Sequence, residues 1–239
     1  MDNYGIADIG ELIKDNAYVG RGIVAGLSES GKYACVAYFI MGRSENSRNR
    51  VFAMKNGALY TEPFDESKVR DASLIIYAAM RETDCDLIVT NGDQTDTIYE
   101  GLKAGKSFSA ALKGRKFEPD APNFTPRISA ILHFNGEFGY EMSILKSADG
   151  KGGACNRYTF DYEPIKGLGH FIHTYITDGD PLPSFTGEPE RVFIPDDAKK
   201  FADNLWNNLN EDNKISLFVR YVDIKSGKKN DILINKNAK

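Results

Sequence analysis

The chain has 239 residues, 41% of them hydrophobic, and a formal net charge of −4 from 30 basic and 34 acidic residues. Its length and apolar content allow a sizeable core, so disorder is not the default, and one large domain or a tightly joined pair is expected. The slight acidity argues against a general nucleic-acid binder, which needs a net basic face.

Cysteines and apolar runs narrow the class further. The three cysteines, Cys35, Cys85 and Cys155, are widely spaced and odd in number, which suggests neither a disulfide framework nor a zinc site. No apolar run approaches the roughly 20 residues of a membrane span, and the N-terminal residues lack the apolar core of a signal peptide. We therefore predict a cytoplasmic protein with no membrane or nucleic-acid partner.

The first elements are a short leader and a hairpin. Residues 1–17 suggest one or two helical turns, and the apolar segments 21–27 and 32–41 flank a Ser/Gly turn, which is typical of a hairpin. Both segments are apolar enough to lie centrally in a sheet. The apolar segment 73–80 fits either a buried strand or a short helix, because it is too short for periodicity to decide.

The segment 86–90 is a clearer strand, and a helical pattern follows it. Thr97 and Glu100 have the spacing of a capping box, which predicts a helix start there. The apolar spacing continues past an interruption at Gly105, so two short helices are expected rather than one long helix.

The second half of the chain is predicted to be a strand meander with one helix. Two hairpins are expected, one from residues 127–134 with 139–146 and one from residues 214–224 with 231–236. A further strand is expected at residues 156–165. A stripe at helical spacing predicts a core-facing helix from Ala198, Phe201, Ala202, Leu205, Trp206 and Leu209. Hairpins with few helices between them indicate an α+β protein with largely antiparallel sheets.

Two segments gather groups suited to a ligand. Residues 43–50 follow an apolar strand and supply three arginines with short hydrogen-bonding side chains, which suits a phosphate or a planar polar ring, although a solvated basic loop fits too. Residues 91–97 join a strand to a helix, where Gly92 permits close approach and backbone N–H groups favour an anion. The polar side chains of the second segment, Glu100 included, could instead only cap the helix.

Familiar metal and catalytic templates fit poorly. The spacing of a calcium-binding loop is missing around Asp84, Asp86, Asp93 and Asp96. Asp93 and Asp96 could form only a weak Mg²⁺ site, because such pairs usually lie in solvated loops. His170 and His173 lack a nearby cysteine or glutamate at zinc-binding spacing. Neither a Gly-x-Ser-x-Gly elbow nor a Walker loop occurs in the sequence.

Four motifs together resemble the archaeal-type IMP cyclohydrolases. They are YVGR at 18–21, RSENSRNR at 43–50, TNGDQTDTI at 90–98 and TPRI at 125–128, and the later segment 174–189 resembles longer bacterial members. The resemblance implies a four-layered αββα sandwich like that of N-terminal-nucleophile hydrolases, with mostly antiparallel sheets. Residues 1–17 would be an N-terminal extension and residues 18–239 a single domain. No serine, threonine or cysteine stands at the strand start, so an autoprocessed nucleophile is not expected.

The resemblance also implies an activity. It is the closure of 5-formamidoimidazole-4-carboxamide ribonucleotide to inosine monophosphate with loss of water, catalysed by a cofactor-independent cyclohydrolase that needs no metal. Arg43 would face the formyl oxygen or the carboxamide, Tyr77 would donate a hydrogen bond or proton, and Glu100 would accept the amide proton. The partner would be a small purine ribonucleotide, and a homo-oligomer is possible.

The resemblance places further residues around the nucleotide, with Arg21, Arg50 and Arg127 as candidates for the phosphate. The implied binding residues are Arg21, Ser44, Arg50, Asn91, Gly92, Thr95, Asp96, Thr97, Thr125 and Arg127. Departures from the family pattern keep two alternatives open, a nucleotide-binding homologue without turnover and an amide hydrolase on the same scaffold. The second alternative requires an activated nucleophile, which the sequence does not place at a strand start.

Overall fold

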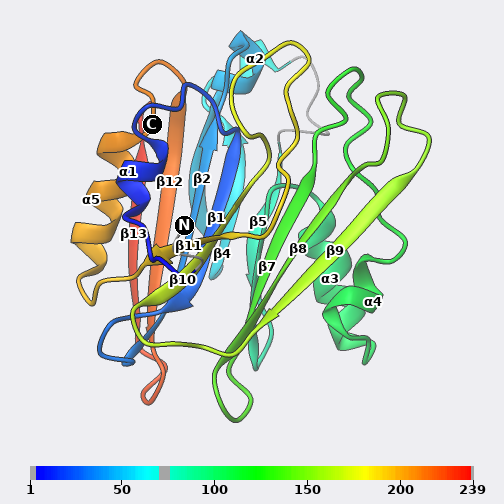
Figure 1. The fold of residues 1–239 in the computed structure, drawn as a ribbon. Coiled ribbons are helices and arrows are strands. Elements are labelled where there is room, and N and C mark those ends of the chain that lie inside the picture. Colours follow the sequence, from blue (N-terminus) through cyan, green and yellow to red (C-terminus); the bar gives the residue numbers. More distant parts are fainter. Residues whose placement is uncertain (1–3, 70–75, 238–239) are drawn as a thin grey trace.

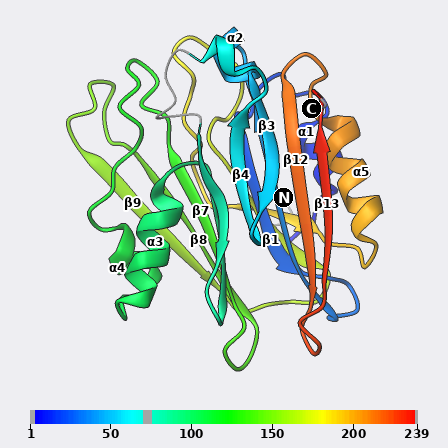
Figure 2. The same cartoon turned by 180° about the vertical axis from the view of Figure 1, so that it is seen from behind.

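Two antiparallel sheets form the centre of the protein in a computed structural model that describes residues 4–69 and 76–237 (Figures 1 and 2). Sheet A has the order β11 (Glu190–Phe193), β10 (Leu168–His173), β1 (Arg21–Leu27), β2 (Tyr33–Met41), β12 (Lys214–Asp223) and β13 (Lys229–Asn235). Sheet B has the order β3 (Arg50–Lys55), β4 (Ala58–Pro63), β5 (Tyr77–Glu82), β6 (Asp86–Thr90), β7 (Arg127–His133), β8 (Gly139–Ser147) and β9 (Cys155–Tyr162).

Helices cover the outer face of each sheet, which gives four layers. Figure 1 shows α1 (Ile9–Ile13) and α5 (Ala198–Asn208) on sheet A, and α3 (Gln94–Lys103) and α4 (Phe108–Leu112) on sheet B. The short helix α2 (Glu45–Arg48) lies at one end of the sandwich, and a 3₁₀ turn (Glu66–Lys68) follows β4. The expected α+β sandwich with antiparallel sheets is therefore present.

Three apolar clusters hold the layers together. The largest lies between the sheets, where Ile23 and Tyr38 from sheet A meet Met80 and Ile128 from sheet B. The other two clusters lie under the helices of sheet A and sheet B. Because both faces of each sheet are covered, the central strands have no polar face, and every residue of β1 is buried.

Most predicted elements are confirmed. The N-terminal hairpin, the strand at 86–90, the meander and the terminal hairpin are all present, and β1 and β2 lie centrally in sheet A. The helix pair breaks at Gly105, whose positive φ of 76° suits glycine. The ambiguous segment 73–80 contributes a strand from Tyr77, while residues 73–75 lie outside the described residues. The hairpin β3–β4 was not predicted.

The predicted capping box is wrong. The α3 helix begins at Gln94 with Asp93 as its N-cap residue, four positions before the predicted N-cap Thr97. The Thr95 hydroxyl bonds the Gly92 carbonyl at 3.2 Å, so Thr95 belongs to the turn that starts the helix. Glu100 consequently lies in the middle of α3 and is exposed.

The N-terminal segment packs on the outer layer of sheet A. Ile9 and Ile13 of α1 are buried in the cluster under α5. The Asn204 amide donates to both carboxylate oxygens of Asp8, at 2.9 and 3.0 Å. Ala7 continues the sheet beyond β11 through a parallel bridge to Val192. The described part of the predicted leader, residues 4–17, thus belongs to this layer.

Candidate functional site

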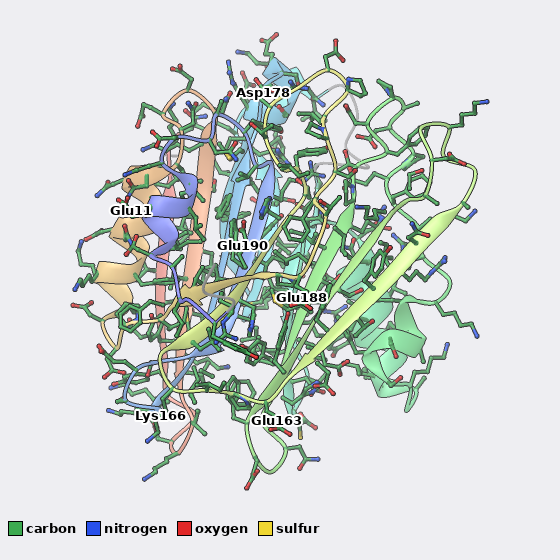
Figure 3. All side chains as sticks on the ribbon, in the orientation of Figure 1. Glu11, Glu163, Lys166, Asp178, Glu188 and Glu190 are labelled. Atoms are coloured by element: carbon green, nitrogen blue, oxygen red, sulfur yellow. The ribbon has the colours of Figure 1, made fainter. Side chains whose placement is uncertain are left out.

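The motif residues converge at the end of the sandwich that carries α2, which we call the α2 end (Figure 1). Antiparallel order brings the starts of β1, β5 and β7 to this end, together with the ends of β2, β6 and β10. Figure 3 shows Asp178, from the loop after β10, beside α2, whereas Lys166 lies at the opposite end. Segments far apart in sequence therefore meet at one place.

A buried ion pair joins β1 to the loop before β7 at the α2 end. Nη2 of Arg21, at the start of β1, donates to Oε1 of Glu118 at 2.8 Å, and the two residues are only 8% and 4% exposed. Burial raises the pKa of Glu118, and Arg21 and Arg127 offset only part of that effect. Nε of Arg21 is buried without a hydrogen-bond partner among the described residues, so a donor is left for a ligand.

Two tyrosines lie beside this pair. The hydroxyls of Tyr38 on β2 and Tyr77 on β5 are 2.8 Å apart, and both side chains are buried between the sheets. Burial raises the pKa of each phenol above its usual value, even though Arg21 and Arg50 act in the opposite direction. Both phenols are therefore protonated at neutral pH and can donate hydrogen bonds.

The loop of residues 118–127, which carries Glu118, is held in place by contacts of Thr125. The Thr125 backbone N–H donates to Oδ1 of Asp120 at 2.7 Å, and the Thr125 hydroxyl bonds the other oxygen of that carboxylate. The same hydroxyl lies 2.5 Å from the Tyr175 hydroxyl. Burial raises the pKa of Tyr175 to about 12. Thr125, predicted as a binding residue, thus ties this loop to the end of sheet A.

The turn after β6 holds Arg127 rigidly. Nη1 of Arg127 lies 2.7 Å from Oε1 of Gln94 and 2.7 Å from Oδ1 of Asp93, which Arg115 also contacts. Although burial opposes the shift, hydrogen bonds from Arg115 and the charge of Arg127 lower the pKa of Asp93. A Cβ on Gly92 would overlap Nη1 of Arg127 and lie 2.7 Å from Oε1 of Gln94, so both side-chain ends would have to shift.

Asn91 and Thr95 have internal partners that fix this turn. The Asn91 amide donates to the Pro126 carbonyl at 2.9 Å, and its oxygen accepts from the Ile128 N–H at 2.9 Å. The Thr95 hydroxyl lies 2.7 Å from the Thr90 hydroxyl. Both side chains are fully buried. They shape the site, and their side-chain groups are already used.

The segment after β2 contributes two exposed arginines, Arg43 and Arg48. Arg48 donates to the Gly42 carbonyl and to Oδ1 of Asn213, both at 3.0 Å. Nη1 of Arg43 donates to Oδ1 of Asp178 at 2.5 Å and to the Gly179 carbonyl at 2.9 Å, and its side chain is 37% exposed. Ser44 instead caps α2. Arg50 is buried and donates to the carbonyls of residues 47 and 41 at 2.7 and 3.1 Å. Of Arg43 and Arg50, Arg43 is the more accessible to a ligand.

Three predicted residues lie outside this cluster. Asp96 pairs with Arg81 at 2.7 Å, on the layer formed by α3. Thr97 is half-buried, and Glu100 is exposed on the same helix. Because α3 covers the outer face of sheet B, these side chains are separated from Tyr77 by the sheet (Figure 1). The structure does not bring them to the α2 end.

Sequence reasoning missed several residues of this cluster. Tyr38 is hidden within an apolar strand, and its partner Tyr77 lies in the other sheet. Glu118 and Asp120 stand in a segment without a recognisable motif, and Tyr175 stands in the segment 174–189 but was not singled out. The partners of Glu118 and Tyr175 are distant in sequence. A search for isolated carboxylates beside apolar positions could have found Glu118. Its pairing with Arg21 is visible only in the structure.

The histidine pair does not form one site. His170 and His173 point to opposite faces of β10. His170 bonds the Tyr140 hydroxyl at 2.7 Å, and burial lowers its pKa to about 4. His173 bonds the Tyr175 carbonyl at 2.7 Å. Among the described residues, no group of three or more His, Cys, Asp or Glu side chains could hold a metal ion.

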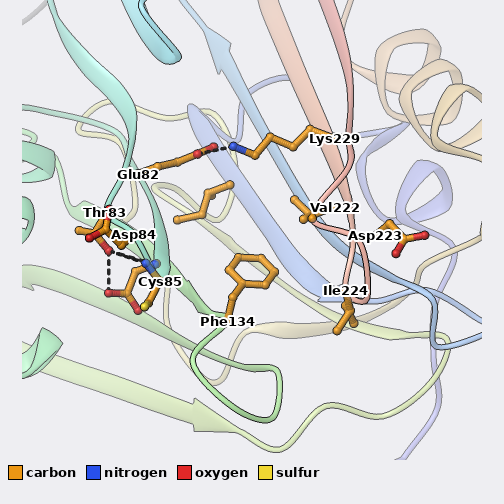
Figure 4. A pocket seen from close by; sticks show the side chains of 12 residues that line it. Glu82, Thr83, Asp84, Cys85, Phe134, Val222, Asp223, Ile224 and Lys229 are labelled. Atoms are coloured by element: carbon orange, nitrogen blue, oxygen red, sulfur yellow. Dashed lines mark hydrogen bonds and ion pairs between the residues drawn. The ribbon is translucent and has the colours of Figure 1, made fainter.

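A cavity of about 250 Å³ lies at the opposite end of the sandwich (Figure 4). Its lining includes the exposed Cys85 and Lys229, which pairs with Glu82. Next to it, His133 lies 3.2 Å from Glu141 and 2.7 Å from a carboxylate oxygen of residue 86. These two contacts, the Glu141 hydrogen bond first, raise the pKa of His133 although burial opposes them. None of the motif residues lies here.

The fold and the α2 end define a two-sheet αββα protein with a buried polar site where the sheets meet. A family profile described as "IMP cyclohydrolase-like protein" matches residues 18–228, and the chain belongs to this family. No helix within the described ranges is long and apolar enough to cross a membrane.

Several relatives carry the name IMP cyclohydrolase. The protein from Methanopyrus kandleri is 32% identical over 180 residues, which cover 70% of this chain and 89% of the relative. The protein from Methanococcus aeolicus is 28% identical over 164 residues, 66% of this chain and 74% of the relative. The protein from Methanocaldococcus jannaschii is 32% identical over 144 residues, 56% of this chain and 70% of the relative.

Proposed function

We propose that this protein is an IMP cyclohydrolase of purine biosynthesis. It closes 5-formamidoimidazole-4-carboxamide ribonucleotide to inosine monophosphate and releases water. The match to the family over residues 18–228 carries this proposal, and the similarity to relatives of that name supports it. We further propose that the enzyme is cytoplasmic, that it needs no cofactor, and that its sandwich is related to the N-terminal-nucleophile hydrolases.

The reaction requires proton transfer more than an external nucleophile. The carboxamide nitrogen attacks the formyl carbon, and the formyl oxygen becomes a hydroxyl as it takes a proton from that nitrogen. The formamido nitrogen then loses its proton, and the hydroxyl takes a second proton and leaves as water. A site must hold the two substituents in contact, stabilise the developing oxyanion and move two protons. Buried donors and one basic carboxylate can perform all three tasks.

We assign the proton chemistry to Tyr77 and Glu118. The Tyr77 phenol, kept protonated by burial, would donate to the formyl oxygen as negative charge develops there. The raised pKa of Glu118 makes its carboxylate a better base for the amide proton than an exposed carboxylate would be. Arg21 would orient Glu118 through their 2.8 Å contact and offer its free Nε to the same oxygen.

Glu118 therefore replaces Glu100 in the proposed mechanism. Glu100 is exposed on α3, on the outer side of sheet B, and its carboxylate would have to act through the sheet. Glu118 is buried in the same polar cluster as Tyr77, and its charge contributes to the raised pKa of that phenol. Burial and proximity favour Glu118.

We assign nucleotide binding to the rim of the same end. Arg43 would bind the phosphate, because its present partners are an exposed carboxylate and a backbone carbonyl that phosphate oxygens can replace. Arg127 and the backbone of Gly92 would contact the ribose or the imidazole carboxamide. Arg50, Asn91 and Thr95 would support the site, since internal hydrogen bonds occupy their side chains.

The experiment is conversion of the formylated ribonucleotide by purified protein, followed as the absorbance of inosine monophosphate. We expect turnover without added metal, and we expect Tyr77→Phe to reduce kcat by about 10²-fold or more with little change in stability. Binding of the nucleotide without product would identify a non-catalytic homologue instead. Release of formate or ammonia without ring closure would identify an amide hydrolase.

A further inference from the structure

The strand β9 is an open edge of sheet B. It pairs along its whole length with β8, from Ser147 opposite Cys155 to Tyr140 opposite Tyr162. Within residues 4–69 and 76–237, no strand and no backbone hydrogen bond from another segment reaches its other side. Figures 1 and 2 both show β9 at the margin of the sheet. Its outer row of backbone N–H and C=O groups is available for pairing.

Two other sheet edges are protected. At the β11 edge, the Ala7 N–H donates to the Arg191 carbonyl at 3.0 Å, and the Ala7 carbonyl accepts from Phe193 at 2.9 Å. At the β3 edge, the Asn235 side chain bonds both the N–H and the carbonyl of Phe52, at 2.9 and 3.0 Å. Comparable cover is missing at β9 among the described residues, although its sequence is rich in residues that favour strands.

The sequence of β9 is complementary to itself in antiparallel orientation. When two copies align with Thr159 opposite Thr159, Arg157 of each copy lies opposite Asp161 of the other. The same register places Tyr158 opposite Phe160 twice. Opposite charges and aromatic side chains directly across an antiparallel pair are stabilising. One register thus produces two ion pairs on one face of the sheet and two aromatic pairs on the other.

The charges on β9 lack such partners within one chain. Asp161 lies directly across from Glu141 on β8, and like charges in that position repel. Arg157 donates only to the carbonyls of residues 155 and 115, and among the described residues it has no carboxylate partner. Tyr158 leaves 47% of its surface exposed. A second β9 would supply a cation to Asp161, an anion to Arg157 and an aromatic contact to Tyr158.

The other open edge, β13, differs in this respect. Lys229 is paired with Glu82, and Asp231 accepts two hydrogen bonds from Arg220, at 2.7 and 2.6 Å. Its charges are therefore satisfied inside the protomer. In addition, a central register on β13 places Asp231 opposite Leu233, which offers no charge complementarity. The unsatisfied, self-complementary charges distinguish β9 from β13.

We propose that β9 pairs antiparallel with β9 of a second copy of this chain, centred on Thr159. The pairing joins the two seven-stranded sheets into one continuous sheet across a two-fold axis. It uses an edge away from the polar cluster between the sheets, and it does not depend on the proposed catalytic activity. The occupant of this edge is a second protomer, because its charge pattern matches itself.

The test reverses the charge of Arg157 in one variant and the charge of Asp161 in another. Sedimentation velocity of the full chain at about 1 to 100 µM should show a concentration-dependent dimer. Arg157→Asp would set two carboxylates directly opposite each other across the interface, and Asp161→Arg would set two guanidinium groups opposite each other. By symmetry each change acts twice, so we expect the dimer dissociation constant to rise at least tenfold in both variants. In a heterodimer of the two variants, each of the two cross-strand positions pairs one carboxylate of the first copy with one guanidinium group of the second, so an equimolar mixture should associate.

Controls keep this test specific. Lys200→Asp makes a similar reversal of charge on an exposed position of α5, in the opposite outer layer, and should leave association unchanged. Far-ultraviolet circular dichroism verifies that the variants fold. A wild-type chain that stays monomeric overturns the proposal. So does a dimer that persists in either single variant, or a mixture of the two variants that stays monomeric.

Discussion

Replacing Glu118 by Gln is the sharpest probe of the site. The amide has nearly the shape of the carboxyl and can still accept the hydrogen bond from Arg21, whose Nη2 lies 2.8 Å away. It removes the negative charge and with it the capacity to take a proton. The substitution therefore separates proton transfer from the packing of the cluster.

The loss of stability expected for Glu118→Gln follows from the burial of Glu118 and Arg21. Removing one partner of a buried ion pair costs about 3–5 kcal/mol, and retention of the hydrogen bond to Arg21 reduces the expected loss to about 2 kcal/mol. For a chain of this size the melting temperature should fall by about 4–8 °C. Loss of a positioned general base should lower kcat by about 10²- to 10⁴-fold. The protein thus stays folded at 25 °C while turnover nearly disappears.

The assay compares Glu118→Gln with Glu100→Gln. Each variant is measured for turnover of the formylated ribonucleotide and for thermal unfolding. Glu100 is exposed on α3, so its variant should match the wild type in both measurements. Wild-type turnover in Glu118→Gln, or loss of turnover only in Glu100→Gln, would refute the assignment of the base.

Three further predictions concern other contacts. Asp178→Ala frees Arg43 from its 2.5 Å ion pair, so KM for the nucleotide should fall several-fold, whereas Arg43→Ala should raise KM. An unchanged KM in both variants would contradict phosphate binding by Arg43. Gly92→Ala forces a Cβ into the Arg127 guanidinium and should cost about 1–3 kcal/mol, measured by urea unfolding; a free energy of unfolding equal to that of the wild type would contradict the close approach. Because the pKa of His133 is raised in the folded state, its stabilising effect is complete below its unfolded pKa and is lost as the pH rises through the folded value. The stability difference between wild type and His133→Gln should therefore be larger at about pH 5.5 than at about pH 8.5, and a pH-independent difference would contradict this prediction.

The sequence allowed most elements to be predicted because their signals are local. The hairpin of β1 and β2 follows from two apolar runs around a Ser/Gly turn, and α5 from its apolar stripe. The break at Gly105 was also predictable, since a glycine interrupts a helical spacing. The start of α3 was not, because hydrogen bonds of Gln94 with residues distant in sequence compete with the local capping signal.

Some residues of the candidate site could be predicted from the sequence and others could not. Arg21, Arg127 and Gly92 stand in sequence motifs, and the structure places all three at the α2 end. Glu118 stands in no motif, in the loop before β7, and its partner Arg21 lies 97 residues away on β1 of sheet A. Glu100 was chosen because it belongs to a motif-bearing segment, although that segment continues into a helix on the outer face. Glu100 is therefore close to the motif residues in sequence but lies apart from the polar cluster in space.

By itself, the sequence determined the α+β class, the family and every hairpin named here except β3–β4, because composition, apolar periodicity and motif order are properties of the chain. Only the tertiary structure decided which polar groups share one environment. Antiparallel pairing brings strand ends from both sheets together, and burial between the sheets then raises the pKa values of Tyr77 and Glu118. Desolvation depends on everything that surrounds a side chain, and no local pattern encodes it.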